Sequence, residues 1–294
     1  RTMRKNKIKT FDVINTIILC ALMLICVYPF IYVIFASFSE PWELTMHRGL
    51  LLRPLGFTLE GYKAVFANRQ IWSGYFTTLF NLVVGTTINI FLTLLAAYGI
   101  SRKDLMLRKP LTIIIVFTMF FNSGIIPRFL VVQKLGLFDT RMAMILPTAI
   151  NVFNLVIMRT AIEGIPSELE EAALLDGANH FTILFKIITP LIKSTLAVLV
   201  LYYGVTHWNQ WYQALMYVQS RELYPLQLVL REILIGSSTE AMTSGAVDSL
   251  GDSFMLGEVI KYATIIVATV PILTIYPMLQ KHFVKGVMVG AVKG

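Results

Sequence analysis

One short segment of this apolar chain is polar and acidic, and its residues could bind a partner. It is Glu170–Pro190, which reads E-E-A-A-L-L-D-G-A-N-H-F-T-I-L-F-K-I-I-T-P. The glutamates load the start of a helix with negative charge, where the helix dipole favours it. The alanines leave room for a partner surface, and a carboxylate at the edge can pair with a partner's arginine. This is the chemistry of a docking element. A solvated amphipathic loop helix remains the alternative.

The same segment carries its own start and stop signals. Ser167 can cap a helix that starts at Glu168, with Pro166 just before it. Asp176-Gly177 should end that helix, because glycine tolerates the positive φ found at helix ends. A second helix is expected from about Asn179. The sequence therefore predicts two short helices and a sharp turn, lying near a membrane surface.

Residues that could carry catalysis form no recognisable constellation. The chain has no G-x-x-x-x-G-K-[ST] loop, so it is not expected to bind ATP phosphates itself. Its histidines are scattered without the spacing of metal ligands: His47, His180, His207 and His282. The chain is therefore predicted not to be an enzyme and to hold no metal.

Composition places these residues in a membrane protein. The chain of 294 residues is 56% hydrophobic and 14% charged, whereas soluble domains average about 25% charged residues. The net charge of +8 is explained by basic cytoplasmic loops, which hold a membrane protein in its orientation. Nucleic acid is not an expected partner, because no basic, aromatic-interleaved surface segment is present.

Apolar runs of about 20 residues are long enough to cross a bilayer. They predict an all-α membrane protein with one transmembrane domain, 1–294, and a loop at 163–193 that holds the docking element. The six predicted spans are residues 13–36, 74–100, 111–132, 142–162, 194–216 and 259–280.

The distribution of basic residues predicts the orientation. Arg1, Arg4 and three lysines precede the first run, which is too long for a typical signal peptide and is expected to stay as a helix. With the N-terminus inside, the inner loops hold more Lys and Arg than the outer ones. Both termini and the 163–193 loop are therefore predicted to be cytoplasmic, in a multi-pass protein of the cell membrane.

Polar side chains inside the predicted spans are candidates for a substrate path, because such groups need a water-filled cavity or a partner helix. Hydrogen bonding between helices is the alternative for the asparagines, and an interfacial belt is the alternative for the aromatic residues. The candidates are Asn122, Asn151, Asn154, Tyr203, Trp208 and Asn209.

Two other classes of function make demands that the sequence does not meet. An ion-gradient-driven secondary transporter needs ionisable groups within its spans, and the apolar cores of the six runs hold no Asp, Glu, Lys or Arg. A membrane-embedded enzyme needs a clustered acid, base or metal site. Neither class is favoured by the sequence.

The segment E-A-A-L-L-D-G-A, followed by Ile187 and Pro190, resembles the E-A-A-x-x-x-G-x9-I-x-L-P signature of ABC importer permeases, with Thr189 in place of the usual leucine. Residues 120–140, the pair Trp208-Asn209 and the C-terminal Q-K-H-F-V-K-G-V-M-V-G-A-V-K-G extend the likeness to most of the chain. Together they resemble carbohydrate permeases of the maltose-permease type, within the branch that imports oligosaccharides derived from complex polysaccharides.

The resemblance implies a type I ABC importer permease fold with a cytoplasmic coupling helix within 167–189. Its partners would be a second homologous permease, a dimeric ABC ATPase, an extracellular solute-binding protein and membrane lipid. ATP and Mg would bind the ATPase, and this chain would hold no cofactor. The tail 285–294 would lie against the ATPase. The residues expected in the ATPase cleft are Glu171, Ala172, Ala173, Asp176 and Gly177.

Overall fold

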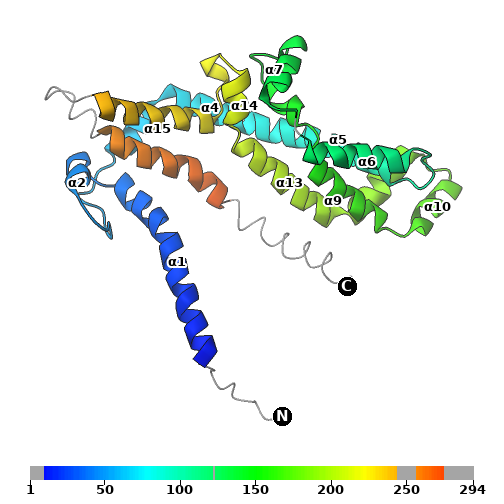
Figure 1. The fold of residues 1–294 in the computed structure, drawn as a ribbon, viewed down its shortest axis with the longest axis horizontal. Coiled ribbons are helices and arrows are strands. Elements are labelled where there is room, and N and C mark those ends of the chain that lie inside the picture. Colours follow the sequence, from blue (N-terminus) through cyan, green and yellow to red (C-terminus); the bar gives the residue numbers. More distant parts are fainter. Residues whose placement is uncertain (1–9, 122, 244–255, 275–294) are drawn as a thin grey trace. The chain divides into compact units, whose positions relative to one another are not determined.

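The computed structural model describes residues 10–121, 123–243 and 256–274, and within that part of the chain all regular structure is helical (Figure 1). The first elements are α1 Thr10–Ser37, α2 Pro41–Met46, α3 Glu60–Ala67, α4 Arg69–Phe80, the π-helix η1 Asn81–Gly85, α5 Thr86–Ser101, α6 Arg108–Phe120, α7 Ile125–Lys134, α8 Met142–Ile145, the 3₁₀ turn η2 Leu146–Thr148 and α9 Val152–Glu163. The later ones are α10 Ser167–Leu175, α11 His180–Thr182, the π-helix η3 Ile183–Ile188, α12 Thr189–Leu191, α13 Lys193–Trp208, α14 Tyr212–Tyr217, the 3₁₀ turn η4 Arg221–Leu223, α15 Leu226–Thr243 and a helix over Leu256–Thr274.

Three of these helices are long and apolar enough to cross a membrane by themselves: Phe11–Ser37, Arg69–Ser101 and Leu256–Thr274. Three pairs of shorter helices pass the same test when each bent pair is counted as one span, which gives up to six. The all-helical fold class is confirmed, and the number of six spans stays a prediction. Residues 275–280 of the last predicted span lie outside the described residues.

The predicted spans 111–132, 142–162 and 194–216 are interrupted in the structure. Gly124, with φ 79°, separates α6 from α7. The α8–η2 helix, which contains Pro147, bends by 53° relative to α9. The helix α13 ends at Trp208, before α14 starts. A run of apolar side chains predicts that a segment enters lipid. It does not predict where the helix breaks, because breaks depend on backbone geometry.

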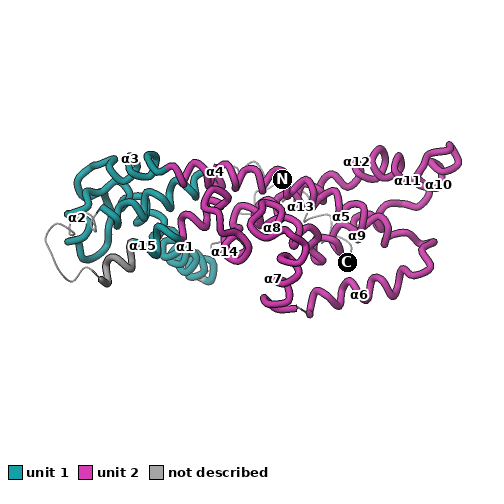
Figure 2. The backbone as a smooth tube through the Cα atoms, turned by 90° about the horizontal axis from the view of Figure 1, so that it is seen from above, with its two compact units in different colours: residues 1–68, 232–270 teal, residues 69–231, 271–294 magenta. Residues whose placement is uncertain are grey.

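Two compact units share the described residues, coloured separately in Figure 2. The smaller unit comprises the described residues 10–68, 232–243 and 256–270. Its buried core is made of Ala36, Leu44, Leu51 and Val259, with the rings of Tyr32 and Tyr262 packed edge to face.

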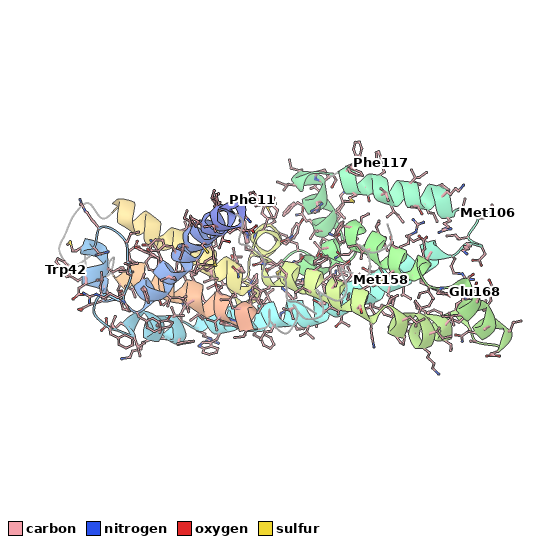
Figure 3. The ribbon with its side chains drawn as sticks, turned by 90° about the horizontal axis from the view of Figure 1, so that it is seen from below. Phe11, Trp42, Met106, Phe117, Met158 and Glu168 are labelled. Atoms are coloured by element: carbon pink, nitrogen blue, oxygen red, sulfur yellow. The ribbon has the colours of Figure 1, made fainter. Side chains whose placement is uncertain are left out.

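The larger unit comprises the described residues 69–121, 123–231 and 271–274. Its main hydrophobic cluster joins α5, α9, α13 and η3, and Met158 lies inside it (Figure 3). By contrast, no residue of α6 is buried within the chain, and Phe117 points away from the bundle (Figure 3). Ile115 packs against the main cluster, while the exposed apolar side chains of α6 have the composition of a surface for lipid or a partner helix.

Polar side chains buried in the larger unit hold its broken helices in place. Asn89 on α5 donates to the carbonyl oxygens of Thr148 and Ala149, both at 2.8 Å, at the break between η2 and α9. Its Oδ1 lies 2.6 Å from Nε2 of His207 on α13. Gly85 is required for this approach, since a Cβ there would lie 2.5 Å from the same imidazole nitrogen. The network therefore supplies hydrogen-bond donors to backbone carbonyl groups at the break, which lack helical partners.

Candidate functional site

The turn between α10 and α11 is a Schellman motif built on Gly177. Gly177 has φ 80°; its N–H donates to the Leu174 carbonyl at 3.0 Å, and the Ala178 N–H donates to the Ala173 carbonyl at 2.9 Å. These are the two hydrogen bonds that define the motif, and they satisfy carbonyls at the end of α10. The predicted helix end at Asp176-Gly177 is confirmed.

The two helix starts differ from one another. The predicted start of a second helix near Asn179 is confirmed, and Asn179 itself caps α11, because its Oδ1 accepts a hydrogen bond from the Thr182 N–H at 2.8 Å. The predicted Ser167 cap is wrong: α10 starts at Ser167 itself, with Pro166 in the cap position and no side-chain cap bond. A residue already inside the first turn is not placed to accept from the N–H two or three residues ahead as a cap does.

The outer face of α10 carries most of the predicted coupling residues. Glu171, Ala172, Asp176 and Gly177 are exposed, and Leu175 has 90% of its surface exposed. Ala173 faces the other way and belongs to the main hydrophobic cluster. Within the described part of the chain, Glu171 forms no ion pair. This outer face therefore combines a carboxylate with small and apolar groups.

The inner face of α10 is tied through Glu170 to Tyr98 on α5 and to Arg102, which directly follows α5. The Oε1 atom of Glu170 pairs with the guanidinium of Arg102 and accepts a hydrogen bond from the Tyr98 hydroxyl at 2.8 Å. The same hydroxyl lies 3.2 Å from Nδ1 of His180 on α11. Both side chains of the Arg102–Glu170 pair are mostly buried, at 19% and 27% exposed, so water weakens it less than a surface pair. A displacement of α10 is thereby linked to α5.

A second ionic contact joins the ends of α6 and α9. Glu163 accepts from Arg159 at 2.8 Å and pairs with Arg108, which also donates to the Ile100 carbonyl at 3.3 Å. Partial burial alone would raise the pKa of Glu163, but the hydrogen bonds from Arg108 and Arg159 hold it below its ordinary value. Helices α5, α6 and α9 thus end in one charged cluster beside α10.

A cavity of about 460 Å³ lies between α10 and the connection from α5 to α6. Charged side chains from both ionic contacts and from α10 line it, namely Arg102, Arg108, Glu163, Glu170 and Glu171. Side chains of both charge signs line it, so the cavity is not a site for an apolar small molecule.

The structure brings three of the predicted path residues together. The Tyr203 hydroxyl bonds to Thr93 at 2.7 Å and accepts from the Asn151 N–H at 3.1 Å. The Asn151 side chain caps α9 by accepting from the Asn154 N–H at 3.2 Å. These are bonds between and within helices, which agrees with the alternative stated for the asparagines. Their assignment to a substrate path stays a prediction.

The other predicted path residues lie apart from this group. Trp208 is buried, with its ring edge against Tyr75 and no hydrogen-bond partner for its Nε1 among the described residues. Asn209 is exposed at the end of α13, and its Nδ2 donates to the Val205 carbonyl at 3.0 Å. Asn122 lies outside the described residues, as does the tail 285–294.

Sequence reasoning missed the Tyr98–Arg102–Glu170–His180 cluster. Glu170 is separated from Tyr98 by 72 positions and His180 from Tyr98 by 82, and no spacing rule connects residues so far apart. The one available signal was the presence of Arg102 and Glu170, opposite in charge, in two segments both predicted to be cytoplasmic.

Three helices long and apolar enough to span a membrane, and an exposed helical element attached to the larger unit, define the chain as a multi-pass membrane protein. The chain belongs to the family of binding-protein-dependent transport system inner membrane components, whose pattern matches residues 89–289.

Relatives of known name cover nearly the whole chain. The polygalacturonan/rhamnogalacturonan transport system permease protein YtcP of Bacillus subtilis is 44% identical over 98% of this chain and 100% of its own. Protein LplC of the same organism is 40% identical over 100% of this chain and 98% of its own.

A solved structure agrees with the sequence relatives. A chain in the crystal structure of a bacterial ABC transporter involved in the import of the acidic polysaccharide alginate has a TM-score of 0.86 and 30% identity, over 96% of this chain and 100% of that one. The type I permease fold is confirmed. The chain is a permease subunit of an ABC importer, and the ion-gradient alternative is not supported.

Proposed function

We propose that this permease forms half of the path by which an oligosaccharide from an acidic polysaccharide enters the cell. The observation that carries the proposal is its 44% identity, along the full length, to a polygalacturonan/rhamnogalacturonan permease. The similarity to the alginate importer supports the same substrate class, since both named polymers contain uronic acids. The other half of the path comes from a second, homologous permease.

The energy comes from a dimeric ABC ATPase that binds ATP and Mg, and an extracellular solute-binding protein delivers the sugar. Both termini lie in the cytoplasm, as the basic residues near the spans favour. The outer face of α10, with Glu171, Ala172, Asp176 and Gly177, then docks in a cleft of the ATPase. Glu171 pairs with a cation there, and Gly177 keeps the turn that shapes the element.

Closure of the ATPase dimer on ATP moves α10, and the cluster at Glu170 conveys the movement to α5. The contact from Glu170 to Arg102 and Tyr98 supports this route, because it joins the docked element to the longest helix of the larger unit. The transporter changes between outward and inward states because the ATPase binds them unequally. The cavity of about 460 Å³ beside α10 is where an ATPase side chain enters.

The test is reconstitution of the whole complex. An affinity tag on this chain should co-purify an ABC ATPase and a second permease in constant proportion. Proteoliposomes with that complex and the binding protein should take up trigalacturonate when ATP is supplied and not when a sodium or proton gradient is supplied alone. Uptake by this chain without an ATPase, or purification as a homo-oligomer with no ATPase, contradicts the proposal.

A further inference from the structure

A second polar site lies between α7 and α14, separate from the coupling element. It is a cavity of about 210 Å³ lined by Gly124, Ile125, Arg128, Tyr212, Gln213, Met216 and Tyr217. One cation, two phenol groups and one amide therefore share a small space. None of the lining residues is Asp or Glu, so nothing in the wall repels an anion.

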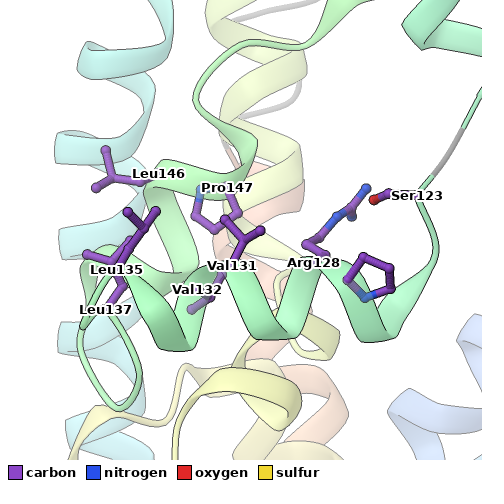
Figure 4. Close-up of a pocket in the computed structure, with 9 residues that line it drawn as sticks. Ser123, Arg128, Val131, Val132, Leu135, Leu137, Leu146 and Pro147 are labelled. Atoms are coloured by element: carbon purple, nitrogen blue, oxygen red, sulfur yellow. The ribbon is translucent and has the colours of Figure 1, made fainter.

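Arg128 also lines a neighbouring cavity of about 440 Å³, between α7 and the η2 turn. Figure 4 shows its guanidinium directed toward Ser123, beside the aliphatic side chains and Pro147 that form the rest of the wall. The remaining lining is largely apolar. The two cavities meet at Arg128, which is the one residue they have in common.

The polar groups of the smaller cavity act on one another. Burial raises the pKa of the Tyr217 hydroxyl, while the positive charge of Arg128 opposes that rise and the nearby Tyr212 adds to it. Tyr217 is only 4% exposed and its ring stacks on Phe129, with 6.3 Å between ring centroids. Arg128, Tyr212 and Tyr217 line the same cavity, so one small ligand in it can meet all three side chains.

The walls of this cavity are fixed before any ligand arrives. Asp139, in the left-handed region with φ 57°, donates its N–H to the Tyr217 carbonyl at 2.8 Å. Its carboxylate accepts from the N–H groups of Gln219 and Ser220 at 2.9 and 2.8 Å. The loop after α7 is thus pinned to the end of α14, which reduces the ordering that binding would require.

We infer that Arg128 binds the carboxylate of a uronate residue of the incoming oligosaccharide, with Tyr212 and Gln213 hydrogen-bonding the same sugar ring. A planar guanidinium matches a carboxylate with two parallel hydrogen bonds. A cavity of about 210 Å³ lies below the range of about 300–1,000 Å³ typical of sites for larger ligands, so it takes one ring of a longer chain. The inference rests on the proposed substrate class.

The experiment compares trigalacturonate with its methyl ester, two substrates that differ in the charge of the carboxyl groups. Uptake of each is measured in proteoliposomes with the complete complex, and basal ATPase activity reports assembly. Arg128→Ala should lower uptake of the acid about tenfold or more, the usual effect of losing a charge-assisted hydrogen bond. Uptake of the ester should stay within about twofold of the wild type.

Two further variants and a matched control complete the design. Arg128→Lys should retain part of the preference for the acid, and Tyr212→Phe should lower acid uptake a few-fold. Lys134→Ala removes a positive charge from the same helix at an exposed position that lines neither cavity, and should leave both substrates unaffected. If Arg128→Ala does not assemble, Arg128→Lys and Tyr212→Phe provide the test in its place.

The outcomes separate the site from the substrate class. A wild-type complex that transports the ester but not the acid overturns the proposed substrate class. A wild-type complex that transports the acid, combined with variants that lower both substrates equally or neither, overturns the assignment to Arg128 and leaves the substrate class standing.

Discussion

Glu170 and Glu171 are adjacent and chemically identical, and both line the cavity beside α10, but they differ in exposure and in partners. Successive residues of an α-helix point about 100° apart, and α10 uses that angle to give each carboxylate its own face. Glu170 is bound by Tyr98 and Arg102 of its own chain. Glu171 is exposed and has no ion pair within the described residues. One glutamate attaches the element to the bundle, and the other is available to a partner.

The difference fits the role proposed for α10 as a coupling element. A surface helix that binds only its partner would separate from its own bundle when the partner moves. A helix that contacts only its own bundle would have no exposed groups for the partner to bind. In α10 the two tasks fall to adjacent residues, with Glu170 attached to the bundle and Glu171 exposed. Among the apolar residues, Ala173 packs inward and Leu175 is exposed. Three substitutions test whether the two faces are functionally distinct.

The largest effect is expected for Glu171→Lys on the outer face. Reversing the charge should abolish its pairing with the ATPase, where an interfacial charge pair contributes about 2–5 kcal/mol. Sugar uptake should fall about 30-fold or more while the complex still inserts in the membrane. Uptake in proteoliposomes and the amount of co-purified ATPase measure this.

A matched control is Glu60→Lys, which makes the same charge change at an exposed position in the first turn of α3. It should leave uptake close to the wild type. Equal losses from the two variants would mean that Glu171 matters only through net charge and would remove its special role.

A smaller effect is expected for Glu170→Gln on the inner face. The amide keeps an acceptor for Tyr98 but loses the ion pair with Arg102, a change of about 1–3 kcal/mol for a hydrogen bond to a charged group. The ATPase should remain attached, while the number of sugars transported per ATP hydrolysed falls several-fold. Loss of ATPase attachment in this variant, as in Glu171→Lys, would erase the distinction between the faces.

The smallest effect is expected for Tyr98→Phe. It removes one hydroxyl that bonds both Glu170 and His180 and leaves the Arg102–Glu170 pair in place, so the free energy of unfolding should fall by about 1 kcal/mol. Thermal unfolding of the purified complex measures it, and coupling should change less than in Glu170→Gln. A larger loss than in Glu170→Gln would show that Tyr98, and not the ion pair, makes the link.

Local features of the coupling element could be predicted from the sequence. The end of α10 at Asp176-Gly177 and the Asn179 cap follow from the backbone preferences of those residue types. The Ser167 cap failed because Pro166 directs the chain into the helix one residue earlier than expected. Helix boundaries of this kind depend on a difference of one residue.

Contacts between distant segments could not be predicted. Glu170 finds Arg102 through the packing of α10 on α5, and Asn151 caps a helix only because the fourth predicted span is broken there. Tyr203, a candidate for the substrate path, makes hydrogen bonds to Thr93 and to the Asn151 N–H, and the Asn151 side chain caps its own helix. Polar type alone does not distinguish these uses.

The hydrogen bonds of Asn89 also bear on the order in which the helices assemble during synthesis of the chain. Its acceptors at Thr148 and Ala149 follow 59 and 60 residues later, and His207 follows 118 residues later. An amide without partners is unfavourable in hydrocarbon. While the ribosome is still synthesising those segments, the helix with Asn89 must remain hydrated or in contact with the insertion machinery, and it reaches its final seat only when α13 has joined it.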